Sequence, residues 1–202
     1  MSSSATKFGV PAYRLILPQG WEELPADREG VGELIKRTSA VLRAGHRPDL
    51  DVEMRNLLES SAKKMQAARA FAIYLQTETA DSDAFPMPMS ITASVVEGQL
   101  GGTLDRQVGA LFRENGAQFL RDDQTVVRWE VEVAGKGDLR GASSKVLDYL
   151  IPIPGSGRRR ALQFTTSIPL PANPDAEDEQ VAAALVDLSD LVISTFEWDP
   201  ID

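Results

Sequence analysis

The chain has 202 residues, of which 43% are hydrophobic and 25% are charged, a composition typical of a folded globular protein. Its formal net charge is -9, and a surface of that sign repels phosphate backbones and anionic lipid, which argues against nucleic acid and membranes as partners. There is no cysteine, and His46 is the only histidine. Disulfides and thiolate zinc sites are therefore excluded, and the side chains that most often act as nucleophile or general base are absent or single.

The polar N-terminal residues lack the apolar core of a signal peptide, and no apolar run approaches the roughly 20 residues that span a bilayer. We therefore expect a cytoplasmic protein. The length suits one domain over residues 1–202, and we expect residues 1–9 to be disordered.

A strand and a pair of helices are predicted first. Residues 12–17 predict a strand that a Pro-Gln-Gly turn ends, and Trp21 follows that turn directly. From Arg28 the apolar residues recur at helical spacing, and a second helix begins near Asp49. Two amphipathic helices in succession predict a helical hairpin over residues 28–69.

Strand patterns dominate the middle of the chain. Residues 71–76 and 89–96 each predict a short strand, and a modest helix follows Gly101. The alternation over residues 127–133 is the clearest in the chain and predicts a strand with one dry face and one wet face.

The fold class follows from how these elements are grouped. Residues 145–168 predict a hairpin whose turn contains two glycines, and the main sheet is expected over residues 71–168. A closing helix is expected over residues 175–198. About six short strands with helices in separate blocks predict an α+β fold, with an antiparallel sheet flanked by helices. Strict alternation of strands and helices is missing, which argues against a doubly wound parallel sheet.

Several strings carry a resemblance to known proteins. They are Leu-Pro-Gln-Gly-Trp ending at Trp21, Pro-Met-Ser-Ile-Thr-Ala-Ser-Val starting at Pro88, Tyr-Leu-Ile-Pro-Ile-Pro starting at Tyr149, and the closing Phe-Glu-Trp that ends at Trp198. The chain resembles a family of uncharacterised actinobacterial cytoplasmic proteins and is, more distantly, similar to the Mog1/PsbP-like α/β/α sandwich. In that fold a glycine–tryptophan turn follows the first long strand and the last helix closes over the sheet, whereas the hairpin at 28–69 is a departure.

The resemblance implies a function of binding rather than catalysis. Members of the wider fold act as binding or assembly modules, and the family offers no catalytic residue to transfer. The missing catalytic chemistry, the acidic charge and the additional hairpin lead us to expect a chaperone, adaptor or immunity-type partner, and the resemblance suggests a link to a type VII secretion or toxin cassette.

The polar clusters predict neither catalysis nor metal binding. His46 has no cysteine or serine elbow motif to work with and is expected to be an exposed loop residue. Asp49, Asp51 and Glu53 lack the later ligands of a calcium loop, so helix capping explains them better, as it does the acids at 175–179. We expect no catalytic residue, no metal and no cofactor.

Two sets of residues are candidates for binding. Arg158, Arg159 and Arg160 follow a glycine-rich turn and are candidates for contact with an anion or a partner, although a hairpin turn with solvated charges is favoured. The second set, which could line a ligand pocket or simply belong to the core, consists of Trp21, Trp129 and Trp198.

The leading hypothesis is a non-enzymatic module that binds another protein, with a basic face as the favoured partner for this acidic chain, and homodimers are a further option. The alternative is a small-molecule-binding domain with a pocket between sheet and helices. A hydrolase that uses carboxylates alone ranks last, since no spacing indicates a pair.

Overall fold

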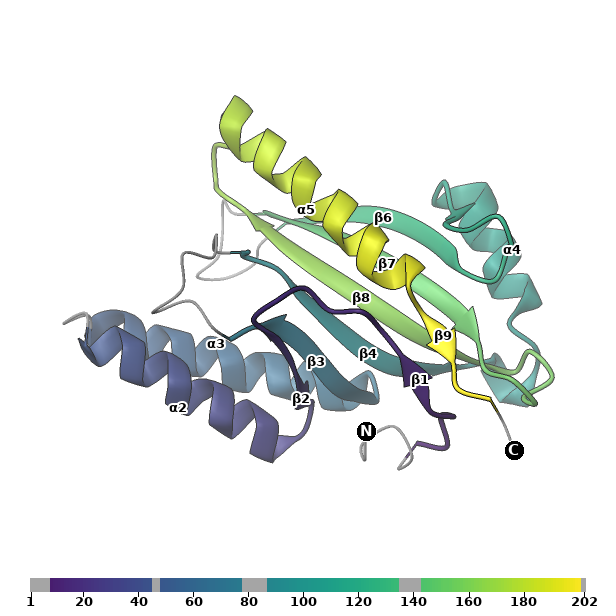
Figure 1. The fold of residues 1–202 in the computed structure, drawn as a ribbon, viewed down its shortest axis with the longest axis horizontal. Helices are drawn as coiled ribbons and strands as arrows, with labels where there is room; N and C mark the ends of the chain where they lie inside the picture. The colour runs from purple at the N-terminus through teal and green to yellow at the C-terminus, as the bar shows by residue number, and fades with distance from the viewer. Residues whose placement is uncertain (1–7, 45–47, 78–86, 135–142, 201–202) are drawn as a thin grey trace.

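The computed structural model describes residues 8–44, 48–77, 87–134 and 143–200 (Figure 1). Within these residues the fold is α+β, as expected, and its main element is a seven-stranded antiparallel sheet in the order β2-β3-β4-β8-β7-β6-β5. The strands of this sheet are β2 (Trp21–Pro25), β3 (Ala70–Gln76), β4 (Ser90–Glu97), β5 (Gln118–Phe119), β6 (Val127–Ala134), β7 (Ser143–Pro152) and β8 (Arg160–Leu170).

The remaining elements are helices and one small sheet. A two-stranded sheet of β1 (Tyr13–Arg14) and β9 (Glu197–Trp198) joins segments near the two ends of the chain. The helices are α2 (Arg28–Ala44), α3 (Pro48–Ala67), the short 3₁₀ helix η1 (Gln99–Gly101), α4 (Asp105–Glu114) and α5 (Ala176–Ser194).

One face of the sheet carries the main core, and α5 lies across this face (Figure 1). The side chains under α5 belong to alternate positions of β3, β4, β7 and β8, because successive residues of a strand point to opposite faces. The largest of them are Tyr74, Ile91, Leu147, Tyr149, Leu162 and Phe164. Asp175 caps α5, since its side chain accepts hydrogen bonds from the backbone N–H groups of Glu177 and Asp178.

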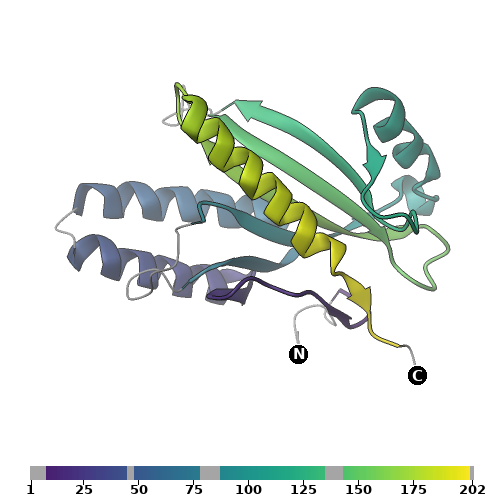
Figure 2. The ribbon, with the colours of Figure 1, turned by 45° about the horizontal axis from the view of Figure 1, so that its top comes forward.

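The opposite face is covered only at its two ends. At one end α2 and α3 pack over β2 and β3, around Val31, Ala70 and Ile73. At the other end α4 covers β6, β7 and β8, around Trp129 and Leu150. Figures 1 and 2 show that the α2–α3 hairpin packs on the sheet near one end and extends beyond it near residues 44 and 48.

Two expectations about chain ends were wrong. The strand expected over 12–17 is reduced to Tyr13–Arg14, which pairs with β9, and Trp21 instead begins a strand of the main sheet. The backbone N–H of Ile16 donates to Thr195 Oγ1 and not to a neighbouring strand. The last helix ends at Ser194, so Trp198 lies in β9 and not on a helix.

The expected dry face of the strand over 127–133 is dry only in its first half. Val127 and Trp129 are buried under α4, but Val131 is 37% exposed and Val133 is 49% exposed. The described helices do not cover these two positions. The alternation of apolar and polar residues therefore continues along the strand, but the burial of its apolar face does not.

Candidate functional site

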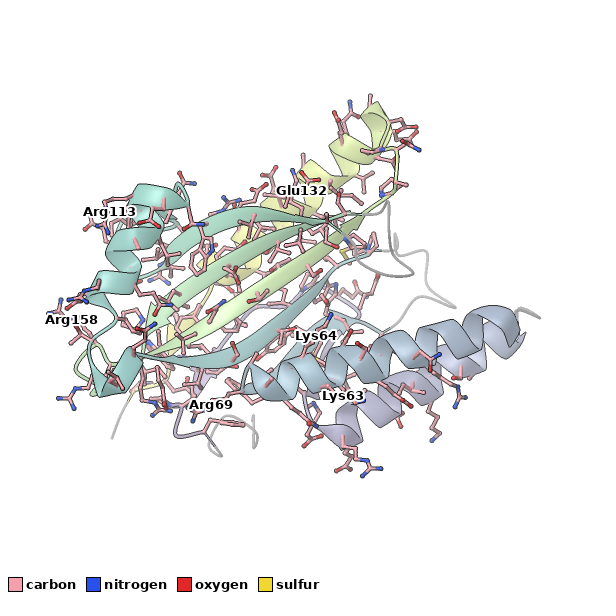
Figure 3. The ribbon with its side chains drawn as sticks, turned by 180° about the vertical axis from the view of Figure 1, so that it is seen from behind. Lys63, Lys64, Arg69, Arg113, Glu132 and Arg158 are labelled. Carbon is pink, nitrogen blue, oxygen red and sulfur yellow. The ribbon has the colours of Figure 1, made fainter. Side chains whose placement is uncertain are left out.

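A row of small polar side chains lies on the uncovered part of the sheet, between α3 and α4. Its members come from alternate positions of β4 and β8, whose intervening residues fill the core under α5. We call it the hydroxyl strip, and it consists of Ser90, Thr92, Ser94, Gln163, Thr165 and Ser167, with Asp148 of β7 beside them. Figure 3 shows this face with α4 on one side and α3 on the other.

Asp148 is the charged residue beside the strip, next to Thr165, the middle of its three members on β8. The ladder aligns it with Thr165 on one side and Trp129 on the other. Its Oδ1 accepts a hydrogen bond from Gln163 Nε2 at 2.8 Å and another from Thr165 Oγ1 at 2.5 Å. The side chain is therefore held in one orientation by neighbours that carry no charge.

No cation among the described residues pairs with Asp148, although the residue is only 9% exposed. Burial raises the pKa of its carboxyl group, and the hydrogen bonds from Thr165 and Gln163 offset this only in part. A desolvated carboxylate without a counter-charge is costly in a folded protein and is a common mark of a functional site.

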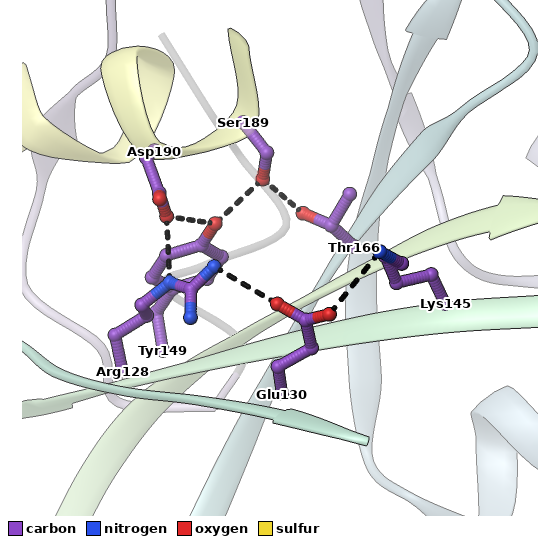
Figure 4. A network of polar contacts seen from close by, with 7 residues as sticks. All are labelled: Arg128, Glu130, Lys145, Tyr149, Thr166, Ser189 and Asp190. Carbon is purple, nitrogen blue, oxygen red and sulfur yellow. Dashed lines mark hydrogen bonds and ion pairs between the residues drawn. The ribbon is translucent and has the colours of Figure 1, made fainter. Parts of the chain in front are cut away.

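The opposite face of the sheet shows how this protein treats a partly buried charge elsewhere (Figure 4). Arg128 lies 3.0 Å from Asp190 of α5 and 3.2 Å from Glu130. Lys145 lies 3.5 Å from the other oxygen of Glu130. Every charge in this network has a partner of opposite sign, which is the arrangement that Asp148 lacks.

The same network fixes α5 to the sheet through hydroxyl groups. The hydroxyl of Tyr149 donates to Asp190 at 2.7 Å and lies 2.8 Å from Ser189 Oγ, which in turn lies 2.7 Å from Thr166 Oγ1. Burial raises the pKa of Tyr149, so the phenol stays protonated at neutral pH and acts as a hydrogen-bond donor. We infer that this network holds α5 against the sheet and does not form a binding site.

Basic side chains lie on the two helices that border this face of the sheet. Lys63 and Lys64 belong to α3 and Arg113 to α4 (Figure 3). Arg69, in the turn between α3 and β3, is paired with Glu97 at 2.8 Å. A surface with a carboxylate at its centre and cations on its flanks can bind groups of both signs and fix their register.

The three candidate arginines do not converge on one point. Arg158 pairs with Asp105 at 3.2 Å, and no described residue forms an ion pair with Arg159. Arg160 donates to the backbone oxygens of Phe8 and Gly9, and its Nε lies 3.4 Å from Glu97 without hydrogen-bond geometry. Arg160 therefore ties the N-terminal segment to the sheet.

The three tryptophans lie in three separate places. Trp21 is buried in the main core, and its Nε1 has no hydrogen-bond partner among the described residues. Trp129 packs under α4 and is aligned with Asp148, so it borders the hydroxyl strip. Trp198 packs edge-on against Phe196 at 4.8 Å and lines an open pocket of about 600 Å³ with Arg14 and other residues.

A smaller pocket of about 170 Å³ lies beneath α4, between the helix and the sheet. Apolar side chains make up most of its lining, and Arg158 and Arg160 are also part of it. Its main apolar members are Leu104, Val108, Val127, Leu150 and Ala161.

The other polar candidates are placed as follows. His46 lies outside the described residues, and Asp49, Asp51 and Glu53 fall in the first turns of α3. Among the described residues, no group of three or more histidines and acids could hold a metal ion. No helix in the described part of the chain combines the length and the apolar character that crossing a bilayer requires.

Asp148 was missed at the sequence level, although a signal exists. It is the only charged residue among residues 146–151, within an otherwise apolar strand. A lone acid on a central strand indicates either a buried ion pair or a site. The basic residue of this strand, Lys145, is three positions away and therefore points to the other face, which favours the second.

No protein-family model and no curated protein matches the chain. Among solved structures it is similar to a point mutant of the protein Mog1, with 15% identity over 63% of this chain and 78% of that one and a TM-score of 0.39. It is also similar to LpqN of Mycobacterium tuberculosis, described as involved in cell envelope biogenesis, with 14% identity, coverage of 94% and 84%, and a TM-score of 0.42. A third match is the Ran-binding protein Mog1p of Saccharomyces cerevisiae, with 18% identity, coverage of 64% and 79%, and a TM-score of 0.35.

Proposed function

We propose that this protein is a non-enzymatic module that binds another protein through the hydroxyl strip. The observation that supports this most directly is Asp148, a carboxylate that is mostly buried, held in place by Gln163 and Thr165, and without a cation among the described residues. A chaperone, an adaptor and an immunity-type partner would all use such a surface.

Electrostatics suggest what the partner presents to Asp148. An ionised carboxylate that is desolvated without a counter-charge loses hydration that its neutral neighbours do not fully replace. A lysine or arginine from a partner would form a charge-assisted hydrogen bond with it and recover part of that free energy. We therefore expect the partner to place a lysine or arginine side chain against Asp148.

The shape and charge of the face favour protein over other ligands. The hydroxyl strip is a row on an open sheet and not a deep cavity, whereas small-molecule pockets typically enclose about 300 Å³ or more. The central carboxylate repels phosphate, which argues against a nucleic-acid backbone despite Lys63 and Lys64 on the flank. Short hydroxyl side chains can donate to and accept from a partner's polar groups.

Photo-crosslinking from the strip tests this proposal. A photoreactive amino acid would replace Thr92 or Ser167 on the strip in the protein expressed in its own cells, and Leu191 would serve as the control position. Leu191 is 63% exposed on α5, on the other face of the sheet. We expect one protein to be captured from both strip positions and not from Leu191.

The same capture in an Asp148→Asn background provides the decisive comparison. We expect capture from Thr92 and Ser167 to fall strongly, because the substitution removes the charge and keeps the size of the side chain. Equal capture from Leu191, or capture that does not change with the substitution at Asp148, would contradict the proposal.

A second candidate function is supported by the pocket beneath α4. At about 170 Å³ it has room for a small apolar group, and an anionic end of that group would have to displace Asp105 from Arg158, which lines the pocket beside apolar side chains. A ligand that binds only the folded protein must raise the melting temperature. Screening small carboxylates by thermal shift, with Val108→Trp to fill the pocket as a control, tests this alternative.

A further inference from the structure

The outer edge of β6 pairs with no other described strand over most of its length. The two-residue strand β5 pairs only with Val127 and Arg128. Over residues 129–134 the outward N–H and C=O groups have no strand partner among the described residues, whereas the inner edge is fully paired with β7. Six residues of strand extend about 20 Å, which is long enough to pair with another strand.

This edge lacks several of the features by which proteins protect a free strand, and its charges are the two glutamates Glu130 and Glu132. Residues 129–134 contain no proline, glycine or lysine, and no bulge interrupts their pairing with β7. Val131 and Val133 are exposed at the edge, on the face that carries the hydroxyl strip. An exposed strand edge of this length is a site for strand addition by a segment whose charges complement the glutamates.

A second copy of this chain is a poor occupant of the edge. Antiparallel pairing of two identical strands about a two-fold axis places residues of the same face opposite each other. Any such register that overlaps most of 129–134 therefore sets Glu130 or Glu132 opposite a glutamate of the other copy. Like charges that are directly opposite destabilise a strand pair.

The charges on the α5 side of the edge favour a basic strand instead. Glu130 and Glu132 point to this side, and Asp187 lies one helical turn before Asp190 on α5. Among the described residues on this side, two cations, Arg128 and Lys145, face these four carboxylates, and both are already paired with Glu130 or Asp190. Glu132 forms no ion pair with a described residue.

We propose that β6 accepts an extended segment of another protein as an eighth strand of the sheet. The segment alternates apolar residues, opposite Val131 and Val133, with lysine or arginine opposite Glu130 and Glu132. This inference rests on the proposed protein-binding function and specifies how the partner is held next to the hydroxyl strip.

Two capped seven-residue peptides serve as probes, one alternating lysine with valine and the other alternating glutamate with valine. Binding is measured by fluorescence anisotropy, and hydrogen exchange locates the protected amides. We expect only the lysine peptide to bind, and we expect it to slow exchange of alternate amides within residues 129–134. Protection elsewhere, equal binding of both peptides or no binding of the lysine peptide would overturn the proposal.

Charge-reversal variants provide the matched control. Glu132→Lys should weaken binding of the lysine peptide about fivefold to tenfold, since it replaces an attraction by a repulsion. Glu114→Lys makes the same change at an exposed position of α4 and should leave binding unchanged. Equal effects of the two variants would show that only net charge matters and would refute strand pairing.

Two further measurements separate this inference from the proposed function. Sedimentation velocity should show a monomer, and a dimer that Glu132→Lys alters would assign the edge to a second copy instead. Peptide binding should persist in Asp148→Asn, because the edge and the strip contact different parts of the partner. Crosslinking that depends on Asp148 without protection of β6 would refute the edge and leave the strip in place.

Discussion

Replacing Asp148 by asparagine should make the protein more stable while weakening its binding. The amide oxygen can still accept the hydrogen bonds that Gln163 and Thr165 donate, so the change removes the charge and little else. Because burial raises the pKa of this carboxyl group, the ionised form is less favourable in the folded protein than in the unfolded chain. Removing the negative charge should therefore raise the free energy of unfolding at neutral pH.

The size of the effect follows from the burial of the residue. Asp148 is 9% exposed and has no cation to offset its desolvation among the described residues. Neutralising such a group should raise the free energy of unfolding by about 1 kcal/mol, the usual range for relieving a destabilised functional site. For a chain of this length that corresponds to an increase of about 2–4 °C in melting temperature.

The pH dependence gives a second check, with a definite sign. A carboxyl group whose folded pKa is raised binds protons more tightly when folded, so stability falls as pH rises from its ordinary value of 3.8 through the folded pKa. The wild type should therefore lose stability relative to Asp148→Asn over this range. The difference in melting temperature between the two proteins should be largest at pH 7 and should shrink toward zero as the pH falls toward 4.

Asp123 is a matched control of opposite sign. Hydrogen bonds from Thr125 and Arg121 lower its pKa to about 2, so its ionised form is favoured by folding. Asp123→Asn should lower the melting temperature at pH 7. The measurement is differential scanning calorimetry of the three proteins from pH 4 to 8. A lower melting temperature for Asp148→Asn at pH 7 would refute the view that Asp148 lacks a compensating partner.

Three further predictions concern the scaffold, and chemical denaturation measures the free energy of unfolding for all of them. Gly30→Ala should destabilise the protein by about 1–3 kcal/mol, because the new Cβ would lie 1.9 Å from the backbone oxygen of Pro25. The Cβ of Gly32→Ala would meet nothing within 4 Å, so this change should stabilise α2 by up to about 1 kcal/mol. Equal effects of the two would contradict the close approach of α2 to β2. Tyr149→Phe should cost about 1–2 kcal/mol, since it removes the hydroxyl that joins β7 to α5, and an unchanged stability would show that the network does not hold the helix. Asp175→Ala should cost about 1 kcal/mol through loss of the cap of α5, with Asp175→Asn retaining most of the stability.

Features that depend on neighbouring residues were predicted well from the sequence. The helical hairpin, the cap at Asp175 and the glycine turn before β8 all follow from periodicity or from backbone preference over a few residues. Gly155 and Gly157 both adopt the positive φ that the turn requires, at 73° and 61°. The α+β class followed from the order of these elements.

Features that depend on distant segments were not predicted. Residues 12–17 have the pattern of a strand, but only Tyr13–Arg14 finds a partner, and that partner is at the other end of the chain. Val131 and Val133 keep the alternation of a buried face, yet α4 is too short to cover them. A pattern shows which side chains share a face and does not show what covers that face.

The candidate site belongs to the same class of feature. The sequence by itself determined that this is an acidic chain without cysteine, built of amphipathic helices and alternating strands, because these properties are counts and periodicities. Only the tertiary structure decided that Asp148 lies next to Gln163 and Thr165 with no cation from the described residues beside it, since the register between β7 and β8 sets its neighbours. Charge pairing and burial are long-range properties, and the order of strands in the sheet fixes both.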